Sequence, residues 1–385
     1  MRRLLRPLAA LSLIAVTSGP VLAAPFAFIS GSDLVDSSTL SVFDTATNSV
    51  TATIPIGGYP FGVAVTASGT RVYVTIETPT GGAVQAIDTA TNSIVMNKAL
   101  GILTTPFGVA TNPSGTRLYV TYLDESDGMR SNMDVIDTAT GFELSTVLLD
   151  VEGNDARGVV VNPADTRIYV TNPNSNTVTV IDTTSHAIVS TITVGSLPFG
   201  VAVNPAGAQV YVANSGSNDV SVIDAATNTV IATVPVGAIP RGVAVHPDGS
   251  RVYVANLEGN SVSVIDAASN TVIATVPVGA GPVGVSLTPD GSRLYVTNSI
   301  ASTVSAIDTA TNTVTATVAA GPFPVSFGVF IGPLGSAGGP GPGPGPGPGP
   351  NTGTHPVPTL GVWGLSALAL VMGLLGARRA GRRGD

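Results

Sequence analysis

The sequence predicts an all-β protein, a seven-bladed β-propeller whose blades are four-stranded antiparallel sheets. Three observations predict this fold. An Asp that follows an apolar residue recurs seven times at intervals of 42 to 49 residues, each interval holds the same four-strand pattern, and Val, Ala and Ile dominate the apolar residues. Repeats of roughly 40 to 50 residues are typical of propeller blades, and β-branched side chains suit a packed, pleated sheet.

One unit, residues 241–279, shows the strand pattern. It contains four apolar or alternating runs, RGVAV, RVYVAN, SVSVID and NTVIATVPVG, separated by polar turns such as HPDGS and LEGN. Turn residues between alternating runs predict antiparallel hairpins. The unit is therefore one blade of four strands.

The recurring aspartates lie in the turn between the third and fourth strands. An Asp can accept a hydrogen bond from the backbone two residues on, and the fifth residue of these turns is Asn, Gly or His, which tolerate a left-handed conformation. We therefore interpret these aspartates as turn residues rather than catalytic ones. The seven are Asp44, Asp88, Asp137, Asp182, Asp224, Asp266 and Asp308.

Strand order and ring closure follow from the pattern. Pro55, Pro235 and Pro277 fall in the fourth strand of their units, which must then be the outer edge, because proline cannot donate to a central ladder. First strands are offset by one unit from second strands. Residues 327–331 should therefore complete the sheet begun by residues 26–56 and leave no partial sheet exposed.

The second strands carry a recognisable repeat. RVYVTI, RLYVTY, RIYVTN, QVYVAN, RVYVAN and RLYVTN are each followed by an alternating strand that ends in Asp. Over residues 26–332 the chain resembles the YVTN-repeat β-propellers, which include secreted and cell-surface proteins. Related seven-bladed folds include lactonases and subunits of quinone-linked dehydrogenases. The resemblance implies the fold strongly and the activity weakly.

Both ends of the chain predict export. Residues 1–23 have an arginine-rich start, a short apolar stretch and small residues before a cleavage point, the form of a secretory signal peptide. The alternative is a first core strand. We expect the propeller over 24–337, a Gly/Pro-rich spacer over 338–356, and over 357–385 an apolar helix with terminal arginines, long enough to anchor the chain in the inner membrane before any processing.

The tail also carries a motif, Val-Pro-Thr-Leu followed by Trp-Gly. It resembles the IPTL-CTERM sorting signal of Gram-negative bacteria, with Val where the family has Ile. The resemblance implies an exosortase-type sorting enzyme as partner and delivery to the cell envelope or cell surface. A plain membrane anchor is the alternative. The motif residues are Val357, Pro358, Thr359, Leu360, Trp363 and Gly364.

Composition excludes several classes of function. The chain has no Cys, which excludes disulfides, thiolate catalysis, covalent c-type haem and Cys-ligated zinc. The net charge is −8, and 7 of the 16 basic residues lie at the two ends. The body is therefore strongly acidic and should repel nucleic acid.

Two candidate sites lie on the face that varies between units. The residue before the Gly-Val of each first strand should line the channel mouth, where aromatic and arginine side chains would suit a small anion or an acidic sugar. The alternative is that the arginines are solvated or pair with local acids such as Asp155. The ligand-binding candidates are Phe61, Phe107, Arg157, Phe199, Arg241 and Phe327.

The second candidate is a metal site in two long loops of one unit. Hard cations such as Ca²⁺ take several carboxylate oxygens of this kind, whereas solvated surface loops are the alternative. The candidates for Ca²⁺, the one cofactor that the sequence suggests, are Asp124, Asp127, Asp150, Glu152 and Asp155.

The sequence contains no G-x-S-x-G, no H-E-x-x-H and no pair of histidines expected to converge. We therefore predict no catalytic residues, and expect a binding scaffold whose variable loop face contacts a protein or glycan at the cell envelope. Two alternatives remain open: a channel-mouth enzyme such as a lactonase-like metal-dependent hydrolase, and a structural cell-surface coat protein.

Overall fold

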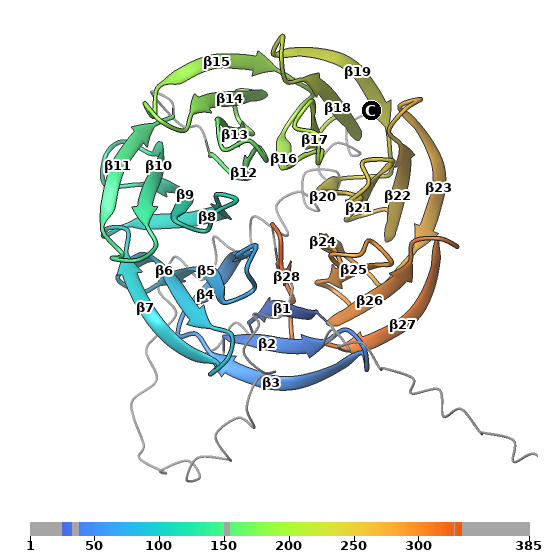
Figure 1. Cartoon of the computed structure of the whole chain (residues 1–385), viewed down its shortest axis with the longest axis horizontal. Helices are drawn as coiled ribbons and strands as arrows, with labels where there is room; N and C mark the ends of the chain where they lie inside the picture. Colours follow the sequence, from blue (N-terminus) through green and yellow to red (C-terminus); the bar gives the residue numbers. More distant parts are fainter. Residues whose placement is uncertain (1–24, 33–37, 150–154, 327, 333–385) are drawn as a thin grey trace, which may run out of the picture. The chain divides into compact units, whose positions relative to one another are not determined.

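The computed structural model describes residues 25–32, 38–149, 155–326 and 328–332. These residues form seven four-stranded antiparallel sheets arranged as blades around a centre (Figure 1), and they include no helix that could cross a membrane. The predicted all-β, seven-bladed fold is confirmed. The predicted signal peptide, spacer and C-terminal helix lie outside the described residues.

We number the blades 1 to 7 in chain order. The innermost strands, from blade 1 to blade 7, are β28 (Ile331–Gly332), β4 (Tyr59–Val65), β8 (Thr104–Thr111), β12 (Val159–Val161), β16 (Pro198–Val203), β20 (Pro240–Val245) and β24 (Pro282–Leu287). The second strands are β1 (Phe26–Gly31), β5 (Arg71–Thr78), β9 (Arg117–Asp124), β13 (Arg167–Asn172), β17 (Gln209–Asn214), β21 (Arg251–Asn256) and β25 (Arg293–Asn298).

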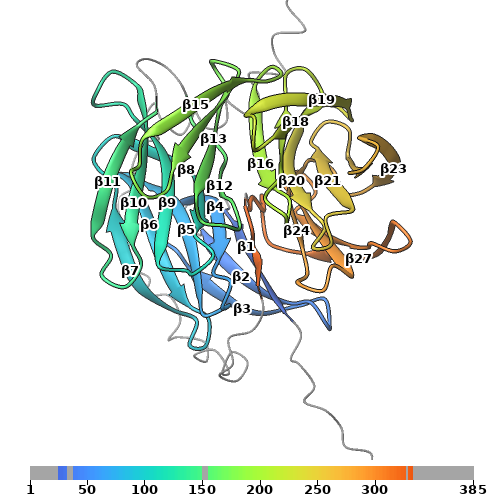
Figure 2. The ribbon, with the colours of Figure 1, turned by 45° about the horizontal axis from the view of Figure 1, so that its top comes forward.

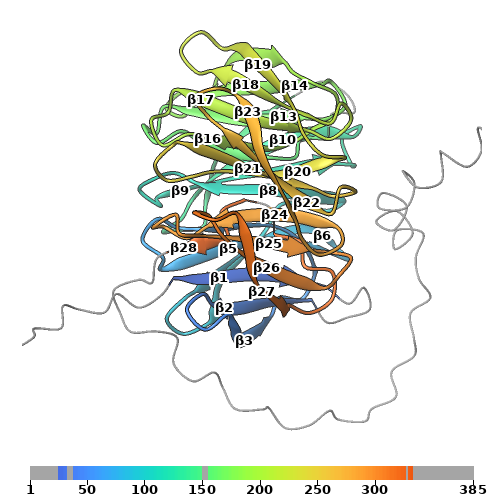
Figure 3. The ribbon, with the colours of Figure 1, turned by 90° about the vertical axis from the view of Figure 1, so that its right-hand side faces the viewer.

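The third strands are β2 (Thr39–Asp44), β6 (Gly81–Asp88), β10 (Arg130–Asp137), β14 (Thr177–Asp182), β18 (Asp219–Asp224), β22 (Ser261–Asp266) and β26 (Thr303–Asp308). The outer strands are β3 (Ser49–Pro55), β7 (Ser93–Ala99), β11 (Glu143–Leu148), β15 (Ile188–Thr193), β19 (Thr229–Pro235), β23 (Thr271–Pro277) and β27 (Thr313–Ala319). Figures 2 and 3 show this order from other directions; β1, β2 and β3 succeed one another outward.

Blade 1 joins the two ends of the propeller, as predicted. β28 pairs antiparallel with β1, with Ala27 opposite Ile331, and the amide of Phe28 donates to the carbonyl of Phe330 at 2.8 Å. The closing strand is shorter than expected, because Val329 turns to the neighbouring blade, where its carbonyl accepts from the amide of Val65 at 2.8 Å. The closing segment therefore links blades 1 and 2 as well as completing a sheet.

The hydrophobic core lies between successive blades, where the sheets pack face to face. The interface of blades 7 and 1 shows the pattern. The ring of Tyr295 packs edge-on against Phe43, with 5.7 Å between centroids, and its hydroxyl donates to the carbonyl of Thr45 at 3.0 Å. Aromatic burial of this kind contributes much of the stability of a core. Each of blades 2 to 7 buries one such tyrosine fully, namely Tyr73, Tyr119, Tyr169, Tyr211, Tyr253 and Tyr295.

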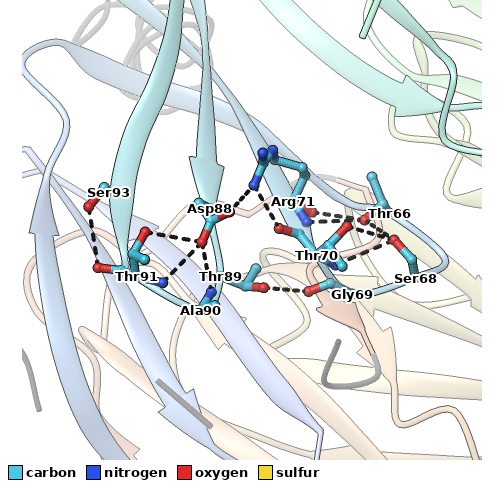
Figure 4. A network of polar contacts seen from close by, with 10 residues as sticks. All are labelled: Thr66, Ser68, Gly69, Thr70, Arg71, Asp88, Thr89, Ala90, Thr91 and Ser93. Atoms are coloured by element: carbon cyan, nitrogen blue, oxygen red, sulfur yellow. Dashed lines mark hydrogen bonds and ion pairs between the residues drawn. The ribbon is translucent and has the colours of Figure 1, made fainter. Parts of the chain in front are cut away.

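The aspartates between the third and fourth strands are turn residues, as predicted. Figure 4 shows the turn of blade 2, where Oδ1 of Asp88 accepts from the amides of Ala90 and Thr91 at 3.1 and 3.0 Å. Its other oxygen pairs with Arg71, and the hydroxyl of Thr89 donates to the carbonyl of Gly69 at 2.6 Å, which ties two turns together. The fifth residue of every such turn has a positive φ: Asn48, Asn92, Gly141, His186, Asn228, Asn270 and Asn312.

The outer strands form the rim of the ring. Pro55, Pro235 and Pro277 each end an outer strand, as their sequence positions predict. In every blade the register shifts between the third and fourth strands, for example between Val264 and Ile265. Bulges and edge prolines discourage the pairing of exposed edges with other chains.

Candidate functional site

The wall of the central channel is built on glycines near the start of the innermost strands. A β-carbon on Gly108 would lie 2.2 Å from the carbonyl oxygen of Arg157 in the next blade, and one on Gly200 would lie 2.2 Å from that of Arg241. Adjacent inner strands therefore meet backbone to backbone, an approach that a side chain would prevent. Six glycines face the next blade in this way: Gly62, Gly108, Gly158, Gly200, Gly242 and Gly284.

A threonine of the second strand braces this contact in three blades. The hydroxyl of Thr121 accepts from the amide of Gly108 at 2.9 Å and donates to the carbonyl of Arg157 at 2.9 Å. Thr75 and Thr171 make the equivalent pair of bonds in blades 2 and 4. This bracket fixes the backbone that carries Phe107, Arg157 and Phe199 at the channel mouth.

The residues immediately before the glycines form an arc of aromatic and arginine side chains at the channel mouth. The rings of Phe61 and Phe107 lie 5.4 Å apart between centroids. The guanidinium carbon of Arg157 lies 3.7 Å from the centroid of Phe107 and 5.5 Å from that of Phe199. That of Arg241 lies 4.1 Å from the centroid of Phe199. Five of the six predicted mouth residues are thus brought together, and the sixth, Phe327, lies outside the described residues.

Below this arc the channel contains a cavity. It is lined by Phe61, Phe107, Arg157 and Phe199 of the arc, and by glycines and valines of the inner strands such as Val201 and Val243. Its walls are mainly apolar with the charged groups at the mouth. A cavity of this kind suits a ligand with an apolar body and one polar or charged end.

Arg157 is buried and has a counterion. Only 9% of the residue is exposed, and the guanidinium forms an ion pair with Asp155. Burial lowers the pKa of Arg157, and the charge of Asp155 opposes that shift. Arg157 is therefore paired with Asp155, as the alternative to ligand binding predicted.

Arg241 has no such counterion among the described residues. Within the described part of the chain, its guanidinium makes no hydrogen bond or ion pair, whereas the seven other arginines there each do. Burial and the neighbouring charge of Arg157 lower the pKa of Arg241 to about 10, so the side chain is still protonated at neutral pH. Its described partner is the face of Phe199.

The structure adds Tyr59 to the predicted residues. Its ring lies 5.2 Å from that of Phe61 and extends the aromatic arc outward. Burial, and then the charge of Glu77, raise the pKa of Tyr59. Tyr59 stands two residues before Phe61, as Asp155 stands before Arg157, so aligning that position across the units was the signal that could have found it.

The acidic loops do not form a metal site from their described residues. Oδ1 of Asp124 accepts from the amide of Ser126 at 2.9 Å, Asp127 pairs with Arg130 at 3.2 Å, and Asp155 pairs with Arg157. Among the residues that the structure describes, no three acidic or histidine side chains lie close enough to hold a metal ion. Asp150 and Glu152 lie outside that set, so the calcium site stays a prediction.

The two histidines of the described chain belong to turns away from the mouth. Nε2 of His186 lies 3.3 Å from the guanidinium of Arg117, and burial lowers the pKa of this histidine. Nε2 of His246 lies 3.1 Å from the carbonyl of Gly291. Both contacts join neighbouring blades, and neither histidine contacts the aromatic and arginine arc.

Comparison with protein families gives two matches. Residues 151–273 match the family described as "Lactonase, 7-bladed beta-propeller", and residues 355–383 match the IPTL-CTERM motif. The chain is a seven-bladed β-propeller with an IPTL-CTERM tail. That motif is a C-terminal sorting signal for the cell envelope. A comparison with curated proteins finds no match.

Solved structures confirm the fold of this propeller. Hydrazine synthase of Kuenenia stuttgartiensis is 21% identical over 70% of this chain and 89% of its own, with a TM-score of 0.61. A functionally unknown protein from Desulfotomaculum acetoxidans is 19% identical over 78% and 100%, with a TM-score of 0.64. Dihydro-heme d1 dehydrogenase NirN in complex with DHE is 13% identical over 79% and 65%, with a TM-score of 0.57. At these identities the likeness extends to the fold alone.

Proposed function

We propose that this protein is exported, held at the cell envelope through its C-terminal tail, and binds a small ligand at the channel mouth. The single observation that carries the proposal is the continuous arc from Tyr59 to Arg241 above an apolar cavity. Five blades contribute to this arc, whereas the turns on the other face repeat one structural pattern. Function in repeat scaffolds concentrates where the repeats differ.

The binding proposal is tested by closing the cavity. The full-length protein is screened by thermal shift against sugars, aromatic acids, amides and lactones, because a ligand that binds only the folded state raises Tm. The screen is repeated with Val243→Phe, which adds bulk inside the cavity, and with Val189→Phe, the same change on an outer strand where the residue is 47% exposed. Ligands of the mouth should lose their effect in the first variant and keep it in the second. Equal responses in both variants would refute a site in the channel.

The envelope proposal is tested on the tail. In this proposal residues 1–23 direct export, the apolar tail holds the chain in the inner membrane of a Gram-negative host, and an exosortase-type enzyme recognises the motif. Pro358→Ala combined with Thr359→Ala should leave an unprocessed, membrane-bound form that blotting of cell fractions detects. Unchanged size and location in this variant would leave a plain anchor as the better account.

A second candidate is lactone hydrolysis, favoured by the match of residues 151–273 to a family named for lactonases. The match includes both Arg157 and Arg241. Among the described residues no three acidic or histidine side chains lie close enough to hold a metal ion, so a metal-dependent activity would need ligands from the loop that contains Asp150 and Glu152. Hydrolysis of a δ-lactone that chelation abolishes and added Ca²⁺ restores would support it; no turnover would exclude it.

A further inference from the structure

The two arginines of the mouth differ in how their charges are balanced. Arg157 lies between two phenylalanine rings and has the carboxylate of Asp155 beside it. Arg241 has the ring of Phe199 and, among the described residues, no carboxylate. The local charges of Arg157, Asp155 and Arg241 therefore leave one positive charge, and it is centred on Arg241.

This imbalance is unusual within the molecule. The body of the chain is strongly acidic, and the other arginines of the described residues are neutralised by Asp side chains or bound to carbonyls. A partly buried guanidinium is stabilised by an aromatic face, but it still loses hydration and is repelled by the charge of Arg157. An anion beside Arg241 would offset both effects.

The surroundings of Arg241 restrict the shape of that anion. The guanidinium carbon of Arg241 lies over the ring of Phe199, which also lines the cavity, so an anionic group bound to this guanidinium places the rest of a ligand near the rings of Phe199 and Phe107. A planar guanidinium presents two parallel N–H donors to a carboxylate. One uncompensated charge matches a monoanion better than a dianion in a protein this acidic.

We infer that the ligand is a small monocarboxylate with a flat or apolar body, whose carboxylate binds Arg241 while its body packs on Phe199 and Phe107. This inference rests on the proposed function and adds the ligand class to it. Arg157 is a positioning residue in this arrangement, because Asp155 already occupies its guanidinium. Arg241 is the residue that recognises charge.

The test uses benzoate as the probe, with benzamide as its neutral isostere and inorganic phosphate as a dianion, each titrated calorimetrically into the full-length protein. We expect benzoate to bind and benzamide and phosphate to bind at least about tenfold more weakly. Arg241→Gln should weaken benzoate binding about tenfold or more. Arg130→Gln, which removes one positive charge from an exposed ion pair, should leave it unchanged.

Asp155→Asn should change the affinity for benzoate in the opposite direction to Arg241→Gln. It keeps the shape and the hydrogen-bond acceptor beside Arg157 but removes the counterion, so benzoate should bind several-fold more tightly. If Asp155 has only a structural role, Asp155→Asn should lower Tm without raising the affinity for benzoate. Benzoate binding that is equal in wild type and Arg241→Gln, or benzamide binding equal to benzoate, overturns the inference.

The failure of this inference is distinguishable from that of the binding proposal. If neutral ligands bind and Val243→Phe blocks them while benzoate fails, the channel site stands and the monocarboxylate class is wrong. If no ligand of the screen responds to Val243→Phe, the channel site itself is wrong. Phosphate binding as tight as benzoate binding also contradicts the class, because it would show that the site prefers charge to shape.

Discussion

Blade 3 and blade 6 have the same strand order but different polar groups inside. In blade 6, Nδ2 of Asn256 donates to the hydroxyls of Ser261 and Ser263 at 3.1 and 3.0 Å, so the buried pair is neutral. In blade 3 the positions of Asn256 and Ser263 hold Tyr122 and Asp134, and the tyrosine hydroxyl donates to Oδ1 of the aspartate at 3.1 Å. Blade 6 thus buries only neutral polar groups at these positions. Blade 3, which carries the long acidic loops, buries a carboxyl group that titrates.

The two blades also differ at the channel wall. Thr121 braces the inner strand of blade 3 to the next blade, whereas blade 6 has Ala255 at the equivalent position. The sequence separation from the wall glycine is the same in both, because Gly108 precedes Thr121 by the interval that separates Gly242 from Ala255. Single substitutions can therefore test how much the shared residues and the differing residues each contribute to stability.

The largest effect should come from the glycines that both blades share. A β-carbon at position 108 or 242 would meet a carbonyl oxygen of the next blade at 2.2 or 2.5 Å, and backbone cannot move aside cheaply. Gly108→Ala and Gly242→Ala should each reduce the free energy of unfolding by about 3 kcal/mol or more. Urea denaturation measures this.

The control is Gly128→Ala in a loop of blade 3. This glycine has a φ of +69° but no atom within 4 Å of an added β-carbon, so only backbone strain remains. It should cost about 1 kcal/mol. Wall variants no less stable than this control would mean that the inner strands separate easily.

The threonine bracket should give the next largest effect. Thr121→Ala removes a buried hydroxyl that joins the amide of Gly108 to the carbonyl of Arg157, and should destabilise the protein by about 2 kcal/mol. Ala255→Thr introduces the hydroxyl into blade 6 and should stabilise it by about 1 kcal/mol. Thermal unfolding of both variants checks the pair. A loss of stability in Ala255→Thr would show that the two walls differ in more than this group.

Asp134 should give a smaller effect that depends on pH. Burial, reinforced by the charge of Glu143, raises the pKa of Asp134 to about 6, while its bonds to Thr146 and Tyr122 oppose the shift. Because the folded pKa exceeds the unfolded one, this group's contribution to stability is fully present at low pH and is lost as pH rises through about 6. Asp134→Asn should therefore stabilise the protein by about 1 to 2 kcal/mol at pH 8 and hardly at all near pH 4.

Tm measured across this range, with Glu143→Gln as a second variant, checks the prediction. Glu143 is exposed and near Asp134, so removing its charge should give a small gain in the same direction. A gain in Asp134→Asn that did not vary with pH would point to packing rather than charge.

The sequence predicted the shared features of the two blades well, because they follow from local rules. The turn aspartates, the outer prolines and the closing strand all depend on the residue types that a turn or an edge accepts, and those types recur in every unit. The approach of Phe61, Phe107, Arg157, Phe199 and Arg241 also followed from the repeat, since equivalent positions of a ring meet at its centre.

What differs between blades was harder to predict. The sequence offered Asp155 as a partner for the mouth arginines, but did not establish its pairing with Arg157, because that pairing depends on side-chain directions. The burial of Asp134 was missed for a related reason. No prediction was made for this aspartate; its pairing opposite Val120 places it inside the blade with 1% exposure, where the hydroxyl of Tyr122 donates to it. Which charged groups pair with one another depends on distances between side chains, and the repeat pattern alone does not determine those distances.

The smallest effect should come from the turns, where both blades are alike. There the contribution of the carboxyl groups to stability depends on pH in the opposite direction to that of Asp134. Asp137 in blade 3 and Asp266 in blade 6 each accept from a side-chain hydroxyl and a backbone amide three residues on, and these bonds lower the pKa of both carboxyls. A lowered folded pKa means that the stabilisation is present above the unfolded pKa of about 3.9 and is lost as pH falls below it.

Asp137→Ala and Asp266→Ala should therefore lower Tm equally and slightly at pH 7, with the difference from wild type shrinking near pH 3. Thermal unfolding at several pH values, alongside Asp134→Asn, compares the two kinds of carboxyl directly. If the turn variants and Asp134→Asn shift Tm in the same direction at pH 8, the distinction between a repeated structural carboxylate and a buried, divergent one is wrong. Opposite shifts would show that blade 3 departs from the repeat at a cost in stability that the turns of the same blade do not share.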